Sequence, residues 1–295
     1  MGEIIGAGLL AHVPTIVLPD EQRRALNQGR ESSLYTGLHR LRRDVFDVLA
    51  PDLVIVFDSH WFTTVEFVIT AAQRRHGYFT SEELPRGMSG VPYDIPGLPS
   101  FARTVGEIAM ATPECWVTPI DDPHLPITYA TTNFLSFLQG PEAWVSVSTC
   151  QTGEPADFAT VGRIIAEAVS QSELRVVLIA SGALSHTFHT LRTLRQHEAA
   201  DEKHIFSEGA RLADHRVIEA LERGDHAQVL DELKAYSAFK PEGRFAHYQM
   251  MAAALGGRDC VAPARRYSEY ENAIGTGQIH LWFDRPTTGW TKERP

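Results

Sequence analysis

The chain has 295 residues, of which 43% are hydrophobic, 9% aromatic and 22% charged, a composition ordinary for a globular protein. Its 37 acidic residues outnumber 27 basic ones and give a formal net charge of −10. No run of Lys and Arg offsets this charge, so nucleic acid is not an expected partner. The longest apolar runs, such as Val54–Phe57, are far shorter than the roughly 20 residues that span a membrane.

Two further features bear on the compartment. The first residues, Met1-Gly2-Glu3, lack the basic segment that opens a signal peptide. The three cysteines have no paired spacing, which favours reduced thiols. We therefore expect a cytoplasmic protein.

Apolar runs rich in β-branched residues predict strands along the chain. These runs are Ile4–Leu10, Leu53–Phe57, Val65–Ala71, Cys115–Ile120, Trp144–Ser148, Arg175–Ala180 and Gln278–Phe283. Between them, apolar residues at steps of three and four predict helices over Leu34–Val48 and Val161–Val169. Pro51-Asp52 is expected to end the first helix before the next strand.

This alternation predicts an α/β fold with a mostly parallel or mixed central sheet and helices on both faces. We expect one catalytic domain over residues 1–295, with a helical subregion over residues 191–256. The stretch Gly77–Pro99 is rich in glycine and proline and is expected to form a long irregular loop. Its aromatic residues Tyr78, Phe79 and Tyr93 could cover a pocket.

A histidine follows each of three predicted strands within a few residues. These are His12, His60 and His186. Ligands in open α/β sheets bind beyond the carboxyl ends of the strands. A single histidine after a strand is usually structural, but three at equivalent positions favour a shared site.

Two imidazoles and one carboxylate form the ligand set of non-haem Fe(II) oxygenases, and zinc hydrolases use the same set. The residues alone do not choose between these metals. Glu242, in a Pro/Gly turn, is a candidate for the carboxylate, although an acid there is more commonly a helix-start residue. Asp58 lies closer in sequence but is better suited to orienting His60. No paired-cysteine motif, phosphate-binding loop or nucleophile elbow is present.

Several segments together resemble the class III extradiol ring-cleavage dioxygenases. They are His12-Val13-Pro14, Val56–Trp61, Ala180–His186 and Gly275–Gln278. Within that family, Phe79–Pro85 and the segment around Tyr93 are most similar to the branch that cleaves 3,4-dihydroxyphenylacetate. The resemblance extends from the first predicted strand to the last.

The resemblance implies a role for each site residue. His12, His60 and Glu242 would bind Fe(II), and His186 would be the catalytic acid/base and contact the substrate. Many family members carry a second active-site histidine, and Tyr129 stands at that position here. This departure argues against the branch that cleaves protocatechuate at its 4,5 bond and makes Tyr129 a second catalytic and substrate-binding candidate.

Three other histidines lie near these motifs in sequence. His124 precedes Tyr129 by five residues and is not its equivalent in the family alignment. His189 and His247 are candidates for contacts around the substrate, because they follow His186 and Glu242 closely.

The resemblance implies an enzyme that opens a catechol ring with O₂ to a semialdehyde, in the catabolism of aromatic compounds. The expected substrate is a catechol with a short acidic side chain, like 3,4-dihydroxyphenylacetate, and a homo-oligomer is expected. Two alternatives remain at this point. One is a 2-aminophenol-type ring cleaver, which would pair with a second, unlike subunit. The other is a zinc-dependent hydrolase.

Overall fold

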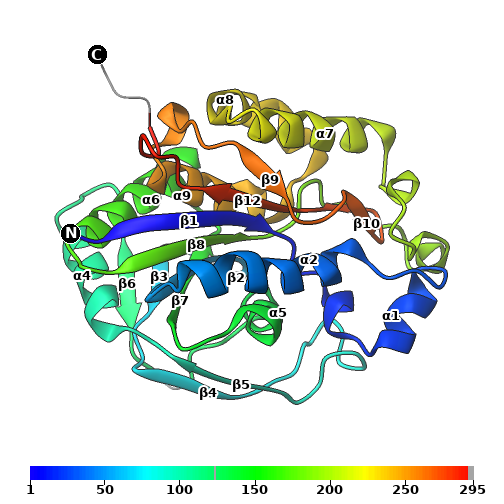
Figure 1. The fold of residues 1–295 in the computed structure, drawn as a ribbon, viewed down its shortest axis with the longest axis horizontal. Helices are drawn as coiled ribbons and strands as arrows, with labels where there is room; N and C mark the ends of the chain where they lie inside the picture. Colours follow the sequence, from blue (N-terminus) through cyan, green and yellow to red (C-terminus); the bar gives the residue numbers. More distant parts are fainter. Residues whose placement is uncertain (123, 292–295) are drawn as a thin grey trace.

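The computed structural model describes residues 1–122 and 124–291. Its centre is an eight-stranded mixed sheet in the order β6-β3-β7-β2-β8-β1-β12-β9 (Figure 1). The strands of this sheet are β1 (Glu3–Leu10), β2 (Leu53–Thr63), β3 (Phe67–Thr70), β6 (Val117–Ile120), β7 (Ala143–Cys150), β8 (Arg175–Ser181), β9 (Ala264–Arg266) and β12 (His280–Asp284). Two separate hairpins are formed by β4 (Arg74–Phe79) with β5 (Val91–Pro96) and by β10 (Glu271–Ala273) with β11 (Thr276–Gln278).

Helices cover both faces of the sheet (Figure 1). The helices of the described residues are α1 (Asp20–Leu26), α2 (Ser33–Leu41), α3 (Asp47–Leu49), α4 (Pro99–Met110), α5 (Tyr129–Leu138), α6 (Pro155–Ser170), α7 (Glu208–Glu222), α8 (His226–Tyr236) and α9 (Ala246–Ala254). A π-helical turn over Arg42–Phe46 joins α2 to α3.

Alternate residues of β2 supply the two cores, because successive side chains of a strand point to opposite faces. Leu53, Ile55 and Phe57 pack with residues of α4, α6 and α9. Val54 and Val56 pack with residues of α2 and α5 on the other face. These five side chains are fully buried, which explains why the run reads as continuously apolar rather than alternating. The predicted α/β class with helices on both faces is confirmed.

Parallel pairing in the centre of the sheet positions the functional residues. β2 runs parallel to β7 and β8, and β8 runs parallel to β1. β12 then pairs antiparallel with β1. The carboxyl ends of β1, β2 and β8 therefore meet at one edge of the sheet.

Two sequence predictions about strands need correction. β2 does not end at Phe57 but continues to Thr63 through a register shift between Phe57 and Phe62, so His60 lies within the strand. The stretch Gly77–Pro99 is not one irregular loop, because its two ends pair as the β4–β5 hairpin. Its tip, residues 80–90, lies outside the two strands, and the Ser81 N–H donates across it to the Met88 carbonyl at 2.9 Å.

The predicted helical subregion contains α7, α8 and α9, with 3₁₀ turns before α7 and between α8 and α9. Within the described residues, none of the helices has both the length and the apolar character needed to cross a membrane.

Candidate metal centre

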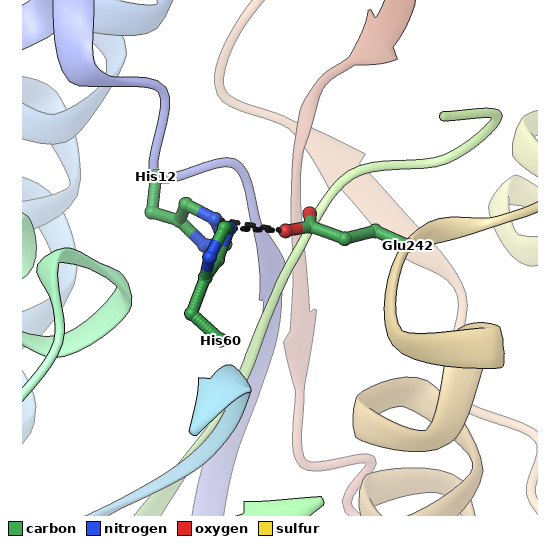
Figure 2. A group of neighbouring side chains, drawn as sticks. All are labelled: His12, His60 and Glu242. Atoms are coloured by element: carbon green, nitrogen blue, oxygen red, sulfur yellow. Dashed lines mark ion pairs between the residues drawn. The ribbon is translucent and has the colours of Figure 1, made fainter. Parts of the chain in front are cut away.

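His12, His60 and Glu242 come together beyond the carboxyl ends of the central strands (Figure 2). His12 is the second residue after β1, His60 lies in the last part of β2, and Glu242 opens a turn before α9. One oxygen of Glu242, Oε1, lies 3.2 Å from His12 Nε2 and 2.7 Å from His60 Nε2. Three ligand-type atoms from three distant segments thus converge on one point.

The tautomer of His12 follows from its neighbours. The Ser181 hydroxyl donates its proton to the Ala130 carbonyl at 2.7 Å. Its oxygen therefore accepts from His12 Nδ1–H, which lies 2.8 Å away. With the proton on Nδ1, the lone pair of His12 Nε2 faces Glu242. This is the state that a metal-binding imidazole requires.

His60 is held through its backbone and its ring. Asp58 accepts hydrogen bonds from the backbone N–H of His60 and of Trp61, both at 2.9 Å. Asp58 also accepts from the hydroxyls of Thr128 and Thr131, which ties β2 to the start of α5. The expected orienting role of Asp58 therefore acts on the His60 backbone.

The charge of His60 is set by Glu242. Burial would lower the pKa of His60, but the negative charge of the Glu242 carboxylate, 2.7 Å away, outweighs burial and raises the pKa to about 10. Burial likewise opposes ionisation of Glu242, yet positive charge on the neighbouring histidines holds the pKa of that carboxyl well below its usual range. Without a metal, the two side chains form a buried ion pair, and a metal would take the place of the imidazolium proton.

Glu242 reaches the site because of an unusual turn. Gly243, Arg244 and Phe245 have φ values of 53°, 59° and 59°, so three consecutive residues adopt the left-handed conformation. Non-glycine residues in that region are strained and tend to occur at functional sites. The other carboxylate oxygen, Glu242 Oε2, accepts from the backbone N–H of Ala183.

The donor set fits a divalent metal ion. Glu242 Oε1 is buried and accepts no hydrogen bond from the residues that the structure describes, although both Nε2 atoms lie beside it. Ligands bound at about 2.1 Å lie roughly 3 Å apart when adjacent, which is close to the separations seen here. The two-histidine, one-carboxylate set leaves further coordination positions open.

A pocket of about 440 Å³ opens from these three residues. His186 and Tyr129 line it, as do Glu83 and Met88 from the tip of the β4–β5 hairpin. Burial lowers the pKa of His186, so its imidazole is neutral near pH 7 and can accept a proton. The volume lies within the range of small-molecule sites, roughly 300–1,000 Å³.

Tyr129 begins α5 and connects His60 with the hairpin tip. Its hydroxyl lies 2.8 Å from His60 Nε2 and donates to Glu83 at 2.9 Å. Burial and the charges of Glu242 and Glu83 raise the pKa of Tyr129, so it stays a neutral phenol. Of the aromatic residues expected to cover a pocket, Phe79 packs against Tyr129 and Met88, whereas Tyr78 is exposed.

Three histidines named from the sequence lie elsewhere. His124 is exposed. His189 stacks on His197 and bonds to the His204 carbonyl, outside the residues that line the pocket. His247 is fully buried against Gly182 and does not line the pocket, and neither ring nitrogen has a hydrogen-bond partner in the described part of the chain. We therefore propose no substrate contact for His189 or His247.

Ser181 and Glu83 are site residues that the sequence patterns did not indicate. Ser181 orients His12, and Glu83 accepts the Tyr129 proton. Ser181 is the last residue of β8, and a small polar side chain at the carboxyl end of a strand that precedes His186 is the signal the sequence offers.

Comparison with known proteins identifies the family of this chain. Residues 6–279 match the family described as the catalytic LigB subunit of aromatic ring-opening dioxygenase. The chain belongs to this family. The match spans most of the sequence and confirms the resemblance to class III extradiol dioxygenases.

One curated relative of the LigB-family chain is 3,4-dihydroxyphenylacetate 2,3-dioxygenase from Escherichia coli. It is 24% identical over 261 residues, which cover 87% of this chain and 91% of that protein. A crystal structure of an uncharacterized protein from Escherichia coli K12 has the same fold, with a TM-score of 0.61 and 17% identity. The superposition covers 94% of this chain and 99% of that one.

Proposed function

We propose that this LigB-family protein is an Fe(II)-dependent extradiol dioxygenase that opens a catechol ring with O₂. The observation that carries the proposal is the convergence of His12, His60 and an unprotonated Glu242 at the mouth of a pocket that also contains a neutral His186. The family match supports the same reaction class. In the balanced reaction, the ring bond beside the diol breaks and both oxygen atoms enter the product, which carries one aldehyde and one carboxylate.

A ferrous ion bound by these three side chains would supply the redox chemistry between catechol and O₂. The chain's own residues handle orientation and protons. His12 and Glu242 are fixed before substrate arrives, because Ser181 and the Ala183 N–H each hold one of their atoms. This rigidity lowers the cost of reaching the reactive geometry.

His186 is the proposed acid/base. A neutral imidazole in the pocket accepts the phenolic proton of the incoming catechol and returns it to a departing oxygen. Such a group typically contributes about 10²–10⁴-fold in rate. Tyr129 remains protonated and is proposed to hydrogen-bond a substrate oxygen, exchanging its bond to Glu83 for one to substrate.

We propose 3,4-dihydroxyphenylacetate as the first substrate to test, supported by the sequence motifs and by the named relative. Arg23 is the one Lys or Arg side chain among the described residues that line the pocket. It is bonded to Glu31 at 2.6 Å and to Asp20 at 2.9 Å, so a substrate carboxylate would compete with two acids for it.

Two variants separate metal binding from proton transfer. Glu242→Ala removes a ligand, so iron content after anaerobic loading should fall to background. His186→Phe leaves the three ligands in place, so it should keep stoichiometric iron and lose about 10²–10⁴-fold in kcat. Normal iron in Glu242→Ala, or iron loss in His186→Phe, would overturn the assignment. Preference for 2-aminophenol over catechols in the same assay would move the protein to the aminophenol branch.

A further inference from the structure

Asp214 is a fully buried carboxylate in α7 that lies outside the metal centre and the pocket. It accepts four hydrogen bonds. Oδ1 accepts from the Ser185 backbone N–H at 3.1 Å and from the Tyr236 hydroxyl at 2.7 Å. Oδ2 accepts from the Ser185 hydroxyl at 2.6 Å and from the Tyr270 hydroxyl at 2.5 Å.

No basic side chain pairs with Asp214 among these contacts, so its charge rests on neutral donors alone. Burial raises the pKa of Asp214, and the bonds from Ser185, Tyr270 and Tyr236 oppose that shift. Burying a carboxylate is costly, and apolar residues of similar volume usually stabilise a core at least as well. A group of this kind is therefore better explained by the geometry it imposes than by stability.

The geometry it imposes concerns the residue before His186. Asp214 holds both the backbone and the side chain of Ser185. From the other side, β11 clamps the same segment, because Gly277 N–H donates to the Ser185 carbonyl and Leu184 N–H donates to the Gly277 carbonyl, both at 2.9 Å.

Gly277 explains part of the Gly275–Gln278 motif, which the metal centre leaves without a role. A Cβ at Gly277 would lie only 2.1 Å from Asp214 Oδ2 and 2.6 Å from the Tyr270 hydroxyl. The absence of a side chain lets β11 approach the carboxylate and the His186 loop together.

The same loop is tied to the metal-ligand turn. The Glu242 N–H donates to the Leu184 carbonyl at 3.2 Å, and the His186 N–H donates to the Phe239 carbonyl at 3.3 Å. A shift of Ser185 would therefore change the position of His186 relative to Glu242.

We propose that Asp214 is a positioning residue that fixes the Ser185–His186 loop, and thereby places the His186 imidazole against substrate. Tyr236 and Tyr270 hold the carboxylate in its orientation. This inference rests on the proposed function, since it assigns a purpose to the location of His186.

Asp214→Asn tests the proposal, because it keeps the size of the side chain and replaces one carboxylate oxygen by an amide NH₂ group that faces two of the four donors. We expect kcat for catechol cleavage to fall about 100-fold, the effect of a misplacement of about 1 Å. KM should stay within about threefold and iron content should be unchanged. In a His186→Phe background, Asp214→Asn should cause no further loss, since residues that act as a unit are not additive.

If loss of a buried hydroxyl lowered kcat only through lower stability, a variant far from the His186 loop would lose as much kcat as one beside it. Tyr248→Phe is the matched control, because it removes a buried tyrosine hydroxyl bonded to His226, away from this loop. Tyr270→Phe should lower kcat about tenfold relative to Tyr248→Phe, and this comparison decides the case if Asp214→Asn does not fold. A kcat within about threefold of wild type in Asp214→Asn and Tyr270→Phe would overturn the proposal. Equal losses from Asp214→Asn with and without His186 would also overturn it.

Hydrogen exchange separates this inference from the proposed reaction. In Asp214→Asn, faster amide exchange confined to residues 183–187 supports the positioning role even if no catechol is cleaved. Unchanged exchange there, or a uniform increase along the chain, refutes it. Absence of ring cleavage by the wild-type protein would refute the proposed function alone.

Discussion

Ser181→Ala perturbs the proposed metal centre without replacing any of its three ligands. The Ser181 hydroxyl accepts from His12 Nδ1–H and donates to the Ala130 carbonyl, and all three groups are buried. The variant therefore leaves one donor and one acceptor without partners. It also frees His12 to adopt the tautomer that presents Nε2–H, which cannot bind a metal.

The expected magnitude follows from these two lost bonds. Removing a partner that orients a ligating histidine typically weakens metal binding about 10–100-fold, which corresponds to roughly 1.4–2.7 kcal/mol. Each group left buried without a partner costs about 1–3 kcal/mol of stability. We expect the Fe(II) dissociation constant to rise about 10–100-fold, with kcat near the wild-type value once iron saturates the site.

Anaerobic Fe(II) titration with a competing chelator measures the effect. Ser59→Ala is the matched control, because Ser59 is also buried and precedes His60, but its hydroxyl has no hydrogen-bond partner among the described residues. Its dissociation constant should stay within about twofold of wild type. Equal affinities in Ser181→Ala and Ser59→Ala would refute the tautomer argument.

Three further predictions concern pH, substrate and metal. Burial lowers the pKa of His280 to about 3, and its neutral ring bonds the Ala11 N–H and the Leu34 carbonyl. The stabilisation that neutral His280 gives is complete above pH 6.5 and declines as the pH falls toward 3. Between these pH values, the free energy of unfolding in urea should fall by about 1.4 kcal/mol per pH unit more in wild type than in His280→Gln. Equal dependence on pH in the two proteins would contradict this. Because Arg23 is already paired, kcat/KM for 3,4-dihydroxyphenylacetate and its methyl ester should differ less than about tenfold, whereas a free arginine would give a larger preference for the acid. Fe(II) at about 100 times its dissociation constant should stabilise wild type by roughly 2.7 kcal/mol in calorimetry and leave Glu242→Ala unchanged.

The fold was largely predictable because its strands are buried on both faces. Runs such as Leu53–Phe57 are apolar without alternation, which is the pattern of a central strand in an α/β sheet. The extension of β2 to Thr63 was not predictable, since polar residues follow Phe57 and the register shift depends on pairing with β7. The sequence pattern did not predict the β4–β5 hairpin, because the glycines and prolines in this stretch are typical of a loop.

The site was predictable where its residues follow strands. His12 and His186 occupy the expected edge because parallel strands bring their carboxyl ends together. Glu242 was one candidate from its Pro/Gly turn, and only the family resemblance assigned it as a ligand, since its direction depends on the left-handed turn over residues 243–245, in which two of the three residues are not glycine. Asp214 could not be foreseen, because its donors Ser185, Tyr236 and Tyr270 are far apart in sequence.

Incorporation of labelled oxygen is the most direct test of whether this protein opens a catechol ring with O₂. The protein would be loaded with Fe(II) without oxygen, mixed with 3,4-dihydroxyphenylacetate, catechol or 2-aminophenol, and exposed to ¹⁸O₂. We expect oxygen uptake equal to the substrate consumed, and a yellow ring-opened semialdehyde carrying two labelled atoms from at least one catechol. Stoichiometric iron with no uptake on any of the three compounds, or a product without label, would contradict it.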